Sequence, residues 1–163
     1  RRFIRKEEPE RQWVDLNRLI RELVAFLKPE LCKADVKLKL QLQEELPVLW
    51  AHDIQLEQVL LNLTRNAIEA MQDVTASERV LLIQTSSSEK GVDLIVEDSG
   101  HGIDEGLRER IFDPFVTTKK QGMGLGLSIS RGIIEEHGGR LLLEHSGHRG
   151  TRLHIVLPTD KGE

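Results

Sequence analysis

Two glycine clusters constrain this chain more than any other feature. The first spans residues 98–103, with the sequence DSGHGI, and the second spans residues 122–127, with the sequence GMGLGL. Glycine accepts positive φ and lets backbone N–H groups approach a ligand closely. A glycine-rich turn that opens onto a helix presents free N–H groups and the positive end of the helix dipole to a phosphate. The two clusters together therefore predict a nucleotide pocket.

Apolar spacing predicts three long helices around these clusters. Hydrophobic residues recur at steps of three and four over residues 15–31, 53–71 and 125–137. We expect Pro29 to bend or end the first helix early, because proline removes a backbone donor. We expect the glycine pair at 138–139 to stop the third helix. A short helix is also predicted over residues 104–111.

Alternating or β-branched runs predict the strands, at residues 36–42, 80–85, 92–96, 140–144 and 151–157. The last two are expected to form a hairpin around residues 147–150. Strands and helices mix without strict alternation. We therefore expect an α/β (α+β) two-layer sandwich, with a mixed, mostly antiparallel sheet of about five strands covered on one face by three helices.

Composition excludes several classes of protein. The chain has 163 residues, 39% of them hydrophobic and 31% charged, which favours one domain with a usable core. The net charge of −4 argues against a nucleic-acid partner. The chain shows no signal-peptide pattern and no run approaching the ~18 apolar residues that span a bilayer. Its one cysteine, Cys32, is expected to be half-buried and fits a reducing, cytoplasmic compartment.

Two asparagines lie four residues apart on the second predicted helix, so Asn62 and Asn66 share a face. An amide oxygen is a suitable ligand for Mg²⁺, and the amide NH₂ group can donate to a phosphate. The same pattern also fits two exposed asparagines with no ligand. Helix interiors disfavour asparagine, however, so a pair on one face requires an explanation.

Asp98 follows the strand predicted at residues 92–96 and precedes the first glycines. An aspartate at such a position can simply initiate a turn. It can also accept a hydrogen bond from the exocyclic amine of adenine. Guanine presents an acceptor at that position, so the contact would discriminate between the two bases.

The segment between the clusters is expected to form a lid. Phe112 and Phe115 would anchor it to the core, although simple packing of both rings explains them equally well. Thr117, Thr118 and Lys119 are the expected lid residues. Lys119 would contact a phosphate or remain solvated.

The motifs, taken in order, resemble those of the catalytic, ATP-binding domain of bacterial sensor histidine kinases. That family belongs to a superfamily shared with the gyrase, Hsp90 and MutL ATPases. The motifs similar to its N box, first glycine box, F box, second glycine box and last glycine motif are residues 62–70, 98–103, 112–115, 122–127 and 150–151. The resemblance covers about residues 12–158 and implies a Bergerat-type ATP-binding fold.

The resemblance also implies ATP and Mg²⁺ as cofactors. It makes Asn66 the metal ligand, with Asn62 supporting the metal or a phosphate. It makes Asp98 the adenine contact, with Thr151 nearby, and it places a flexible lid over about residues 113–123. The other nucleotide contacts that it implies are Arg65, Gly100, Gly102, Ile103, Phe115, Thr117, Thr118, Lys119, Gly122, Gly124, Leu125, Gly126 and Leu127.

The implied reaction is transfer of the ATP γ-phosphoryl group to a histidine on a dimerisation domain, and then to an aspartate of a response regulator receiver domain. In the ATPase branch, a glutamate four residues before the metal-binding asparagine activates water. Here that position is Asn62, and an amide cannot act as a general base at neutral pH. The substitution favours phosphotransfer over hydrolysis.

None of the six histidines fits the phosphoacceptor pattern. We therefore expect residues 12–163 to be the catalytic domain and residues 1–11 to be a remnant of the preceding dimerisation helix or a linker. The fragment is expected to be monomeric and to bind ATP without phosphorylating itself.

Three alternatives use the same pocket. An ATPase of the gyrase or Hsp90 class would hydrolyse ATP in the steady state. A serine kinase of the anti-sigma or mitochondrial dehydrogenase-kinase type would give an acid-stable phosphoprotein. A non-catalytic nucleotide sensor would keep its Mg²⁺-dependent binding after Asn66→Ala.

Overall fold

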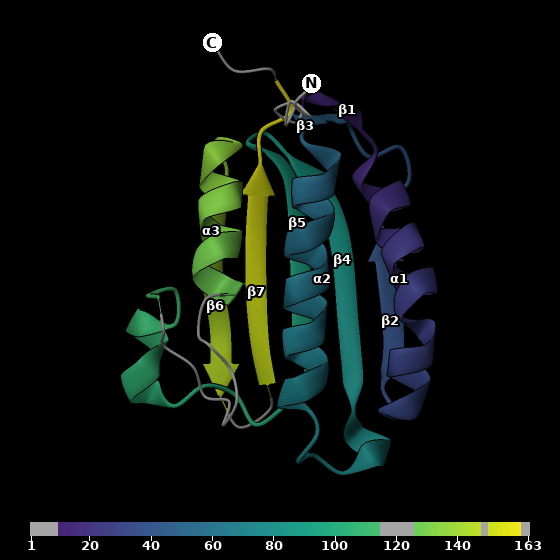
Figure 1. Cartoon of the computed structure of the whole chain (residues 1–163), viewed down its shortest axis with the longest axis vertical. Coiled ribbons are helices and arrows are strands. Elements are labelled where there is room, and N and C mark those ends of the chain that lie inside the picture. Colours follow the sequence, from purple (N-terminus) through teal and green to yellow (C-terminus); the bar gives the residue numbers. More distant parts are fainter. Residues whose placement is uncertain (1–9, 115–125, 148–149, 161–163) are drawn as a thin grey trace, which may run out of the picture.

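Three helices cover one face of a five-stranded sheet (Figure 1). The structure is a computed structural model that describes residues 10–114, 126–147 and 150–160, apart from the side chains of residues 145–147. The helices are α1 (Leu16–Lys33), α2 (Asp53–Ala70) and α3 (Gly126–Glu136). The predicted two-layer sandwich is confirmed.

The sheet is mixed and mostly antiparallel, as expected. Its strands lie in the order β2 (Lys37–Leu42), β4 (Val80–Ser88), β5 (Gly91–Asp98), β7 (Gly150–Leu157) and β6 (Arg140–Gly147). Only β2 and β4 run parallel, and the other three neighbouring pairs are antiparallel. The register of β5 and β7 sets Asp98 opposite Thr151, so two predicted site residues meet at one end of the sheet.

The core lies between the sheet and the helices. On α2, the buried apolar residues recur with helical period and belong to one face, namely Leu56, Val59, Leu60, Leu63, Ala67 and Ile68. On β5, Val92, Leu94 and Val96 alternate toward the same core. The central helix α2 therefore packs against β5 with one face. Its remaining surface stays available for polar residues.

The other face of the sheet is charged. His154 on β7 contacts Asp93 on β5 at 2.7 Å and Glu144 on β6 at 2.9 Å. Arg152, two residues before His154, contacts Glu144 at 3.1 Å and Glu97 at 3.6 Å. Alternation along the strands therefore separates an apolar, helix-covered face from a polar one.

Two short strands were not predicted. β1 (Gln12–Val14) and β3 (Leu49–Ala51) pair antiparallel in a separate sheet. Trp13 and Trp50 lie opposite each other, with ring centroids 5.1 Å apart in an edge-to-face arrangement. Segments of three residues carry too little alternation to predict a strand from sequence.

Pro29 does not end α1, which was one of the two effects that the sequence predicted for it. The helix continues through it to Lys33. Leu27 and Leu31, on either side of the proline, are buried at 0% and 5% exposure. Their packing against the core offsets the hydrogen bond that proline removes. Cys32, on the same last turn, is exposed rather than half-buried.

Two short 3₁₀ helices complete the described elements, η1 (Ala76–Glu78) and η2 (Glu105–Arg110). The second coincides with the short helix predicted over residues 104–111. In the described segments, no helix combines the length and the hydropathy needed to cross a bilayer. Residues 1–9 lie outside the description, so the assignment of residues 1–11 to a preceding helix or linker stays a prediction.

The C-terminal end of α3 is tied to the part of the chain that enters the domain. Arg11 donates from Nη2 to the carbonyl oxygen of Glu136, at 2.7 Å. The backbone N–H of His52, at the start of α2, donates to Nε2 of His137 at 3.0 Å. Burial lowers the pKa of His137, which favours the neutral imidazole that this bond requires. The end of α3 is therefore held from two sides.

Candidate nucleotide-binding site

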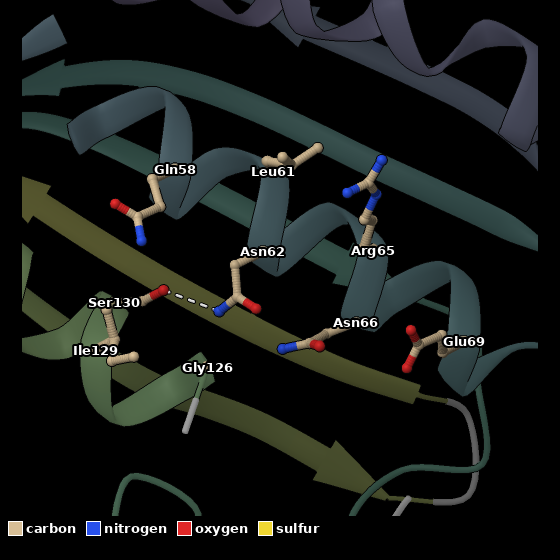
Figure 2. Close-up of a pocket in the computed structure, with 9 residues that line it drawn as sticks. All are labelled: Gln58, Leu61, Asn62, Arg65, Asn66, Glu69, Gly126, Ile129 and Ser130. Carbon is tan, nitrogen blue, oxygen red and sulfur yellow. Dashed lines mark hydrogen bonds between the residues drawn. The ribbon is translucent and has the colours of Figure 1, made fainter. Parts of the chain in front are cut away.

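A cavity of about 340 Å³ lies between α2 and α3 (Figure 2). Its α2 residues recur at steps of three and four, which places them on one helix face. The lining residues are Gln58, Leu61, Asn62, Arg65, Asn66 and Glu69 from α2, with Gly126, Ile129 and Ser130 from α3. Four residues that the sequence predicted for the site therefore meet here, namely Asn62, Arg65, Asn66 and Gly126.

Asn62 contacts α3 directly. Its Nδ2 donates to the hydroxyl oxygen of Ser130 at 2.9 Å. A Cβ added at Gly126 would lie 2.6 Å from Oδ1 of Asn62, so only glycine fits there without displacing the amide. Figure 2 shows the amide oxygen of Asn62 turned toward Asn66 and the amide nitrogen turned toward Ser130.

Arg65 lines the cavity but is bound to α1. Its Nη2 and Nε donate to the two carboxylate oxygens of Glu30, at 2.7 and 3.3 Å. The hydrogen bond to Glu30 raises the pKa of Arg65. In Figure 2 its guanidinium points away from Asn66. The structure therefore places this residue at the rim of the cavity, in a surface ion pair that is worth about 0–1 kcal/mol.

Asp98 ends β5 as a buried acid, with 8% of its surface exposed. Its Oδ1 accepts from the backbone N–H of Gly100 at 2.8 Å, which is the turn-initiating contact expected of such an aspartate. Burial raises its pKa to about 6, while hydrogen bonds from the backbone of Gly100 and Thr151 oppose the rise. At pH 7.5 the group is mainly a carboxylate, able to accept further hydrogen bonds.

Glycines allow the chain to close around Asp98. Gly150 has φ of +122°, and a Cβ there would lie 1.8 Å from the carbonyl oxygen of Asp98. A Cβ at Gly100 would lie 2.5 Å from the carbonyl oxygen of Ala70, at the end of α2. Side chains at either position would push β7 or α2 away from the acid.

One helix connects the two clusters. Asn62, Asn66 and Ala70 follow one another at four-residue spacing along α2. At 1.5 Å rise per residue, the eight residues from Asn62 to Ala70 span about 12 Å. Asp98 is not among the residues that line the cavity, so the structure groups the predicted residues at two places on one wall. Such a wall suits an elongated ligand with chemically different ends.

The remaining predicted contacts are less completely described. The carbonyl of Ile103 accepts from Nε of Arg108 at 3.3 Å, and Gly102 has φ of +81°. Leu127 packs against the core. The predicted contacts that lie outside the described residues are Phe115, Thr117, Thr118, Lys119, Gly122, Gly124 and Leu125.

Phe112, which directly precedes the predicted lid, packs against the core. The guanidinium of Arg131 on α3 lies over its ring, 4.9 Å from the centroid. The ring therefore joins the end of η2 to α3. The expected role of Phe115 as a second anchor stays a prediction.

Sequence reasoning missed three polar residues that line the cavity, Gln58, Glu69 and Ser130. Gln58 lies four residues before Asn62, and Ser130 lies four residues after Gly126, so helical spacing was a usable signal for both. The contact between Asn62 and Ser130 could not be predicted, because it depends on how α3 packs against α2.

The donor set fits a magnesium ion. The cavity offers amide oxygens from Asn62, Asn66 and Gln58 and a carboxylate from Glu69, all of them hard oxygen donors. Among the described residues there is no group of three or more His, Cys, Asp or Glu side chains able to hold a metal. Mg²⁺ uses one or two protein ligands together with waters and phosphate oxygens, and the oxygen donors of this cavity could supply such ligands.

Comparison with known families supports the same interpretation. The family described as "Histidine kinase-, DNA gyrase B-, and HSP90-like ATPase" matches residues 51–161. The chain belongs to this family. The match contains all of α2, Asp98 and α3, and therefore both residue clusters.

Curated members of this family are similar over nearly the whole chain. The sensor protein TdiS of Thauera aromatica is 36% identical over 158 residues, which are 96% of this chain and 29% of TdiS. The sensor protein FixL of Bradyrhizobium diazoefficiens is 36% identical, over 97% of this chain and 31% of FixL. The chain therefore spans about a third or less of the length of these relatives.

Solved structures of the family share the fold. The catalytic domain of histidine kinase ThkA superposes with a TM-score of 0.81 at 36% identity, over 92% of this chain and 96% of that domain. Full-length ShkA in complex with AMPPNP gives 0.81 at 27% identity, over 93% of this chain and 31% of ShkA. The expected histidine kinase catalytic-domain fold is confirmed.

Proposed function

We propose that this chain is the ATP-binding catalytic domain of a two-component sensor histidine kinase. In this proposal it transfers the γ-phosphoryl group of ATP to a histidine on a separate dimerisation domain, for relay to an aspartate of a response regulator. The observation that carries the proposal is the arrangement along α2. Asn62 and Asn66 line a cavity, and the buried acid Asp98 lies near the C-terminal end of the same helix. Family membership and the sensor-kinase relatives support it.

Asp98 would hold the adenine end of the nucleotide. Because its pKa is about 6, the side chain is ionised at neutral pH and accepts a hydrogen bond from the exocyclic amine. Burial makes the contact selective, since a base with an acceptor at that position would leave two acceptors facing each other. Thr151, opposite Asp98 in the register, would border the base.

Asn66 and Asn62 would hold the other end, where Mg²⁺ when bound supplies neutralising charge to the phosphates. Asn66 would be the metal ligand, with Asn62 supporting the metal or a phosphate oxygen. Gly126, at the N-terminus of α3, adds a helix end whose free N–H groups suit an anion. The chain's own contribution to transfer is therefore to bind and orient the nucleotide.

The proposal favours phosphotransfer over hydrolysis for a chemical reason. Asn62 occupies the position where the ATPase branch carries its water-activating glutamate, and an amide does not accept a proton at neutral pH. A histidine on a partner domain is a competent nucleophile without such a base. The chain itself would be a cytoplasmic monomer that binds ATP, and the dimerisation domain would supply the phosphoacceptor histidine.

A response regulator is the proposed downstream partner. One structural neighbour, at 32% identity and a TM-score of 0.77, is the histidine kinase ThkA in complex with the response regulator protein TrrA. The similarity makes a receiver domain the partner to offer first in a binding assay.

Calorimetry with ATP, with and without Mg²⁺, tests the pocket. We expect Asp98→Ala to nearly abolish binding of adenine nucleotides and Asn66→Ala to remove the Mg²⁺-dependent part of the affinity. If both variants bind like the wild type, the pocket is assigned wrongly.

Phosphotransfer is tested by offering the chain a histidine-containing dimerisation domain together with labelled ATP. An acid-labile phosphoprotein supports histidine kinase activity. An acid-stable product would favour a serine kinase, and steady-state phosphate release by the chain alone would favour an ATPase.

A further inference from the structure

Asn62 is held by a residue of the neighbouring helix α3. The Ser130 hydroxyl oxygen accepts from Nδ2 of Asn62 at 2.9 Å, and only 2% of the surface of Ser130 is exposed. Gly126 lies one helical turn earlier on the same face of α3 and meets the same amide. The side chain of Asn62 therefore lies against two successive turns of α3.

The orientation of this amide has chemical consequences. An asparagine side chain carries donors on its nitrogen and an acceptor on its oxygen, and a half-turn about the Cβ–Cγ bond exchanges them. Only the amide oxygen can coordinate a cation, whereas the amide NH₂ group would repel it. With the nitrogen bound to Ser130, the oxygen faces the side of the cavity that holds Asn66, as Figure 2 shows.

We propose that Ser130 is a positioning residue, which holds the Asn62 amide so that its oxygen faces the magnesium-bound triphosphate. The proposal rests on the proposed function, because it assumes that a metal-bound nucleotide occupies this cavity. It also makes the orientation of Asn62 depend on α3. If α3 moves away from α2, the amide loses its partner and can rotate.

The first test uses the unliganded protein and therefore needs no nucleotide. In nuclear magnetic resonance spectra, the two side-chain NH₂ signals of Asn62 are expected at separate positions with slowed hydrogen exchange. Ser130→Ala should bring them to the position and exchange rate of a solvated asparagine amide. Unchanged Asn62 signals in Ser130→Ala would overturn the proposal.

The second test separates positioning from a general structural role. Ser130→Ala should weaken binding of Mg-ATP about fivefold, the loss expected for about one hydrogen bond, and leave the affinity for adenosine unchanged. The matched control is Thr85→Ala, which removes another buried hydroxyl that bonds an asparagine, Asn17, away from the cavity. This control should change neither affinity. Equal losses for Mg-ATP and adenosine in Ser130→Ala would overturn the proposal.

Two further variants keep the test decisive if Ser130→Ala is poorly folded. Ser130→Thr retains a hydroxyl at the same position and should restore Mg-ATP affinity and the Asn62 signals. In an Asn62→Ala background, adding Ser130→Ala should cause no further loss, because the interaction is already gone. Additive losses would overturn the proposal. Failure of the wild type to bind Mg-ATP would instead overturn the proposed function.

Discussion

Two asparagine–hydroxyl pairs occur among the residues that the structure describes, and they differ in what surrounds them. Asn17 on α1 donates from Nδ2 to the carbonyl of Gln43 at 2.7 Å and accepts at Oδ1 from Thr85 at 2.8 Å. The hydroxyl of Thr85 accepts in turn from the backbone N–H of Gln43 at 3.1 Å. Both ends of that amide are used within the fold, and its network is closed.

The pair of Asn62 and Ser130 is open. One end of the amide is bound to α3, and the other faces a cavity. Identical side-chain chemistry therefore closes a network within the fold in one place and borders a cavity in the other, where we propose that it binds a ligand. The difference teaches that an asparagine on a helix indicates function only when part of its hydrogen-bonding capacity is directed away from the protein.

The largest effect is expected in the closed network. Asn17→Ala removes two buried hydrogen bonds and leaves Thr85 and the Gln43 carbonyl without their partner, at a cost of about 3 kcal/mol in the free energy of unfolding. Urea denaturation measures this loss. The folded variant should bind Mg-ATP like the wild type, and a large loss of affinity would break the distinction between the two pairs.

The pair of Asn62 and Ser130 should show the reverse, a large loss of Mg-ATP affinity and a small loss of stability. Asn62→Ala is expected to weaken Mg-ATP binding about thirtyfold, or ~2 kcal/mol, because a charge-facing hydrogen-bonding group is lost. The free energy of unfolding should fall by about 1 kcal/mol, less than for Asn17→Ala, since one hydrogen bond within the fold is removed and one buried hydroxyl, that of Ser130, loses its partner. The comparison fails if calorimetry shows normal affinity while urea denaturation shows a loss as large as that of Asn17→Ala.

The ligand-facing region should also respond to pH. Asp98 takes up a proton near pH 6, so the affinity for adenosine should fall about tenfold between pH 7.5 and pH 5. Adenosine is the appropriate probe because it carries no phosphate that titrates in this range. Affinity that is flat across the range would show that the ionised acid does not hold the base.

Protonation of Asp98 also changes the free energy of unfolding, in a direction that its pKa shift fixes. The pKa of Asp98 is raised in the folded state, so its contribution favours folding below its unfolded pKa near 3.9 and is lost as pH rises through about 6. The closed network of Asn17, Thr85 and the Gln43 backbone contains no group that titrates between these values.

A smaller effect is expected at the contact between α3 and Asn62. Gly126→Ala places a Cβ 2.6 Å from Oδ1 of Asn62, closer than such atoms approach, and should displace the amide. Because the clash is with a movable side chain, we expect about a threefold loss of Mg-ATP affinity, or ~0.7 kcal/mol. Gly132→Ala, on the same helix with no atom near its added Cβ, is the control. Equal affinity for Mg-ATP in both variants would show that Gly126 does not help to position the amide of Asn62.

The sequence predicted most of the fold because long periodic segments carry a strong signal. Residues 53–71 show one apolar face over five turns, and the observed α2 begins at the predicted residue and ends one residue earlier. The strands β1 and β3 were missed because three residues cannot establish a period. The interruption expected at Pro29 was wrong because burial of Leu27 and Leu31 outweighs local propensity.

The candidate site was predictable only in part. Asn62, Asn66 and Asp98 could be selected because their chemistry is unusual at the end of a strand or inside a helix. Ser130 offered only its four-residue spacing from Gly126 as a signal, since the chemistry of a serine in an amphipathic helix is ordinary. Its importance comes from the packing of α3 on α2, which no local pattern encodes.

Two hydrogen bonds tie α3 to separate parts of the domain. Arg11 donates to the carbonyl of Glu136, the last residue of α3, while Ser130, near the middle of the helix, accepts from Asn62. An α-helix of 11 residues moves as a nearly rigid unit along its axis. A shift of α3 along its axis would therefore change the 2.7 Å contact with Arg11 and the 2.9 Å contact with Asn62 at the same time, so the position of this helix and the orientation of an amide in the cavity are linked.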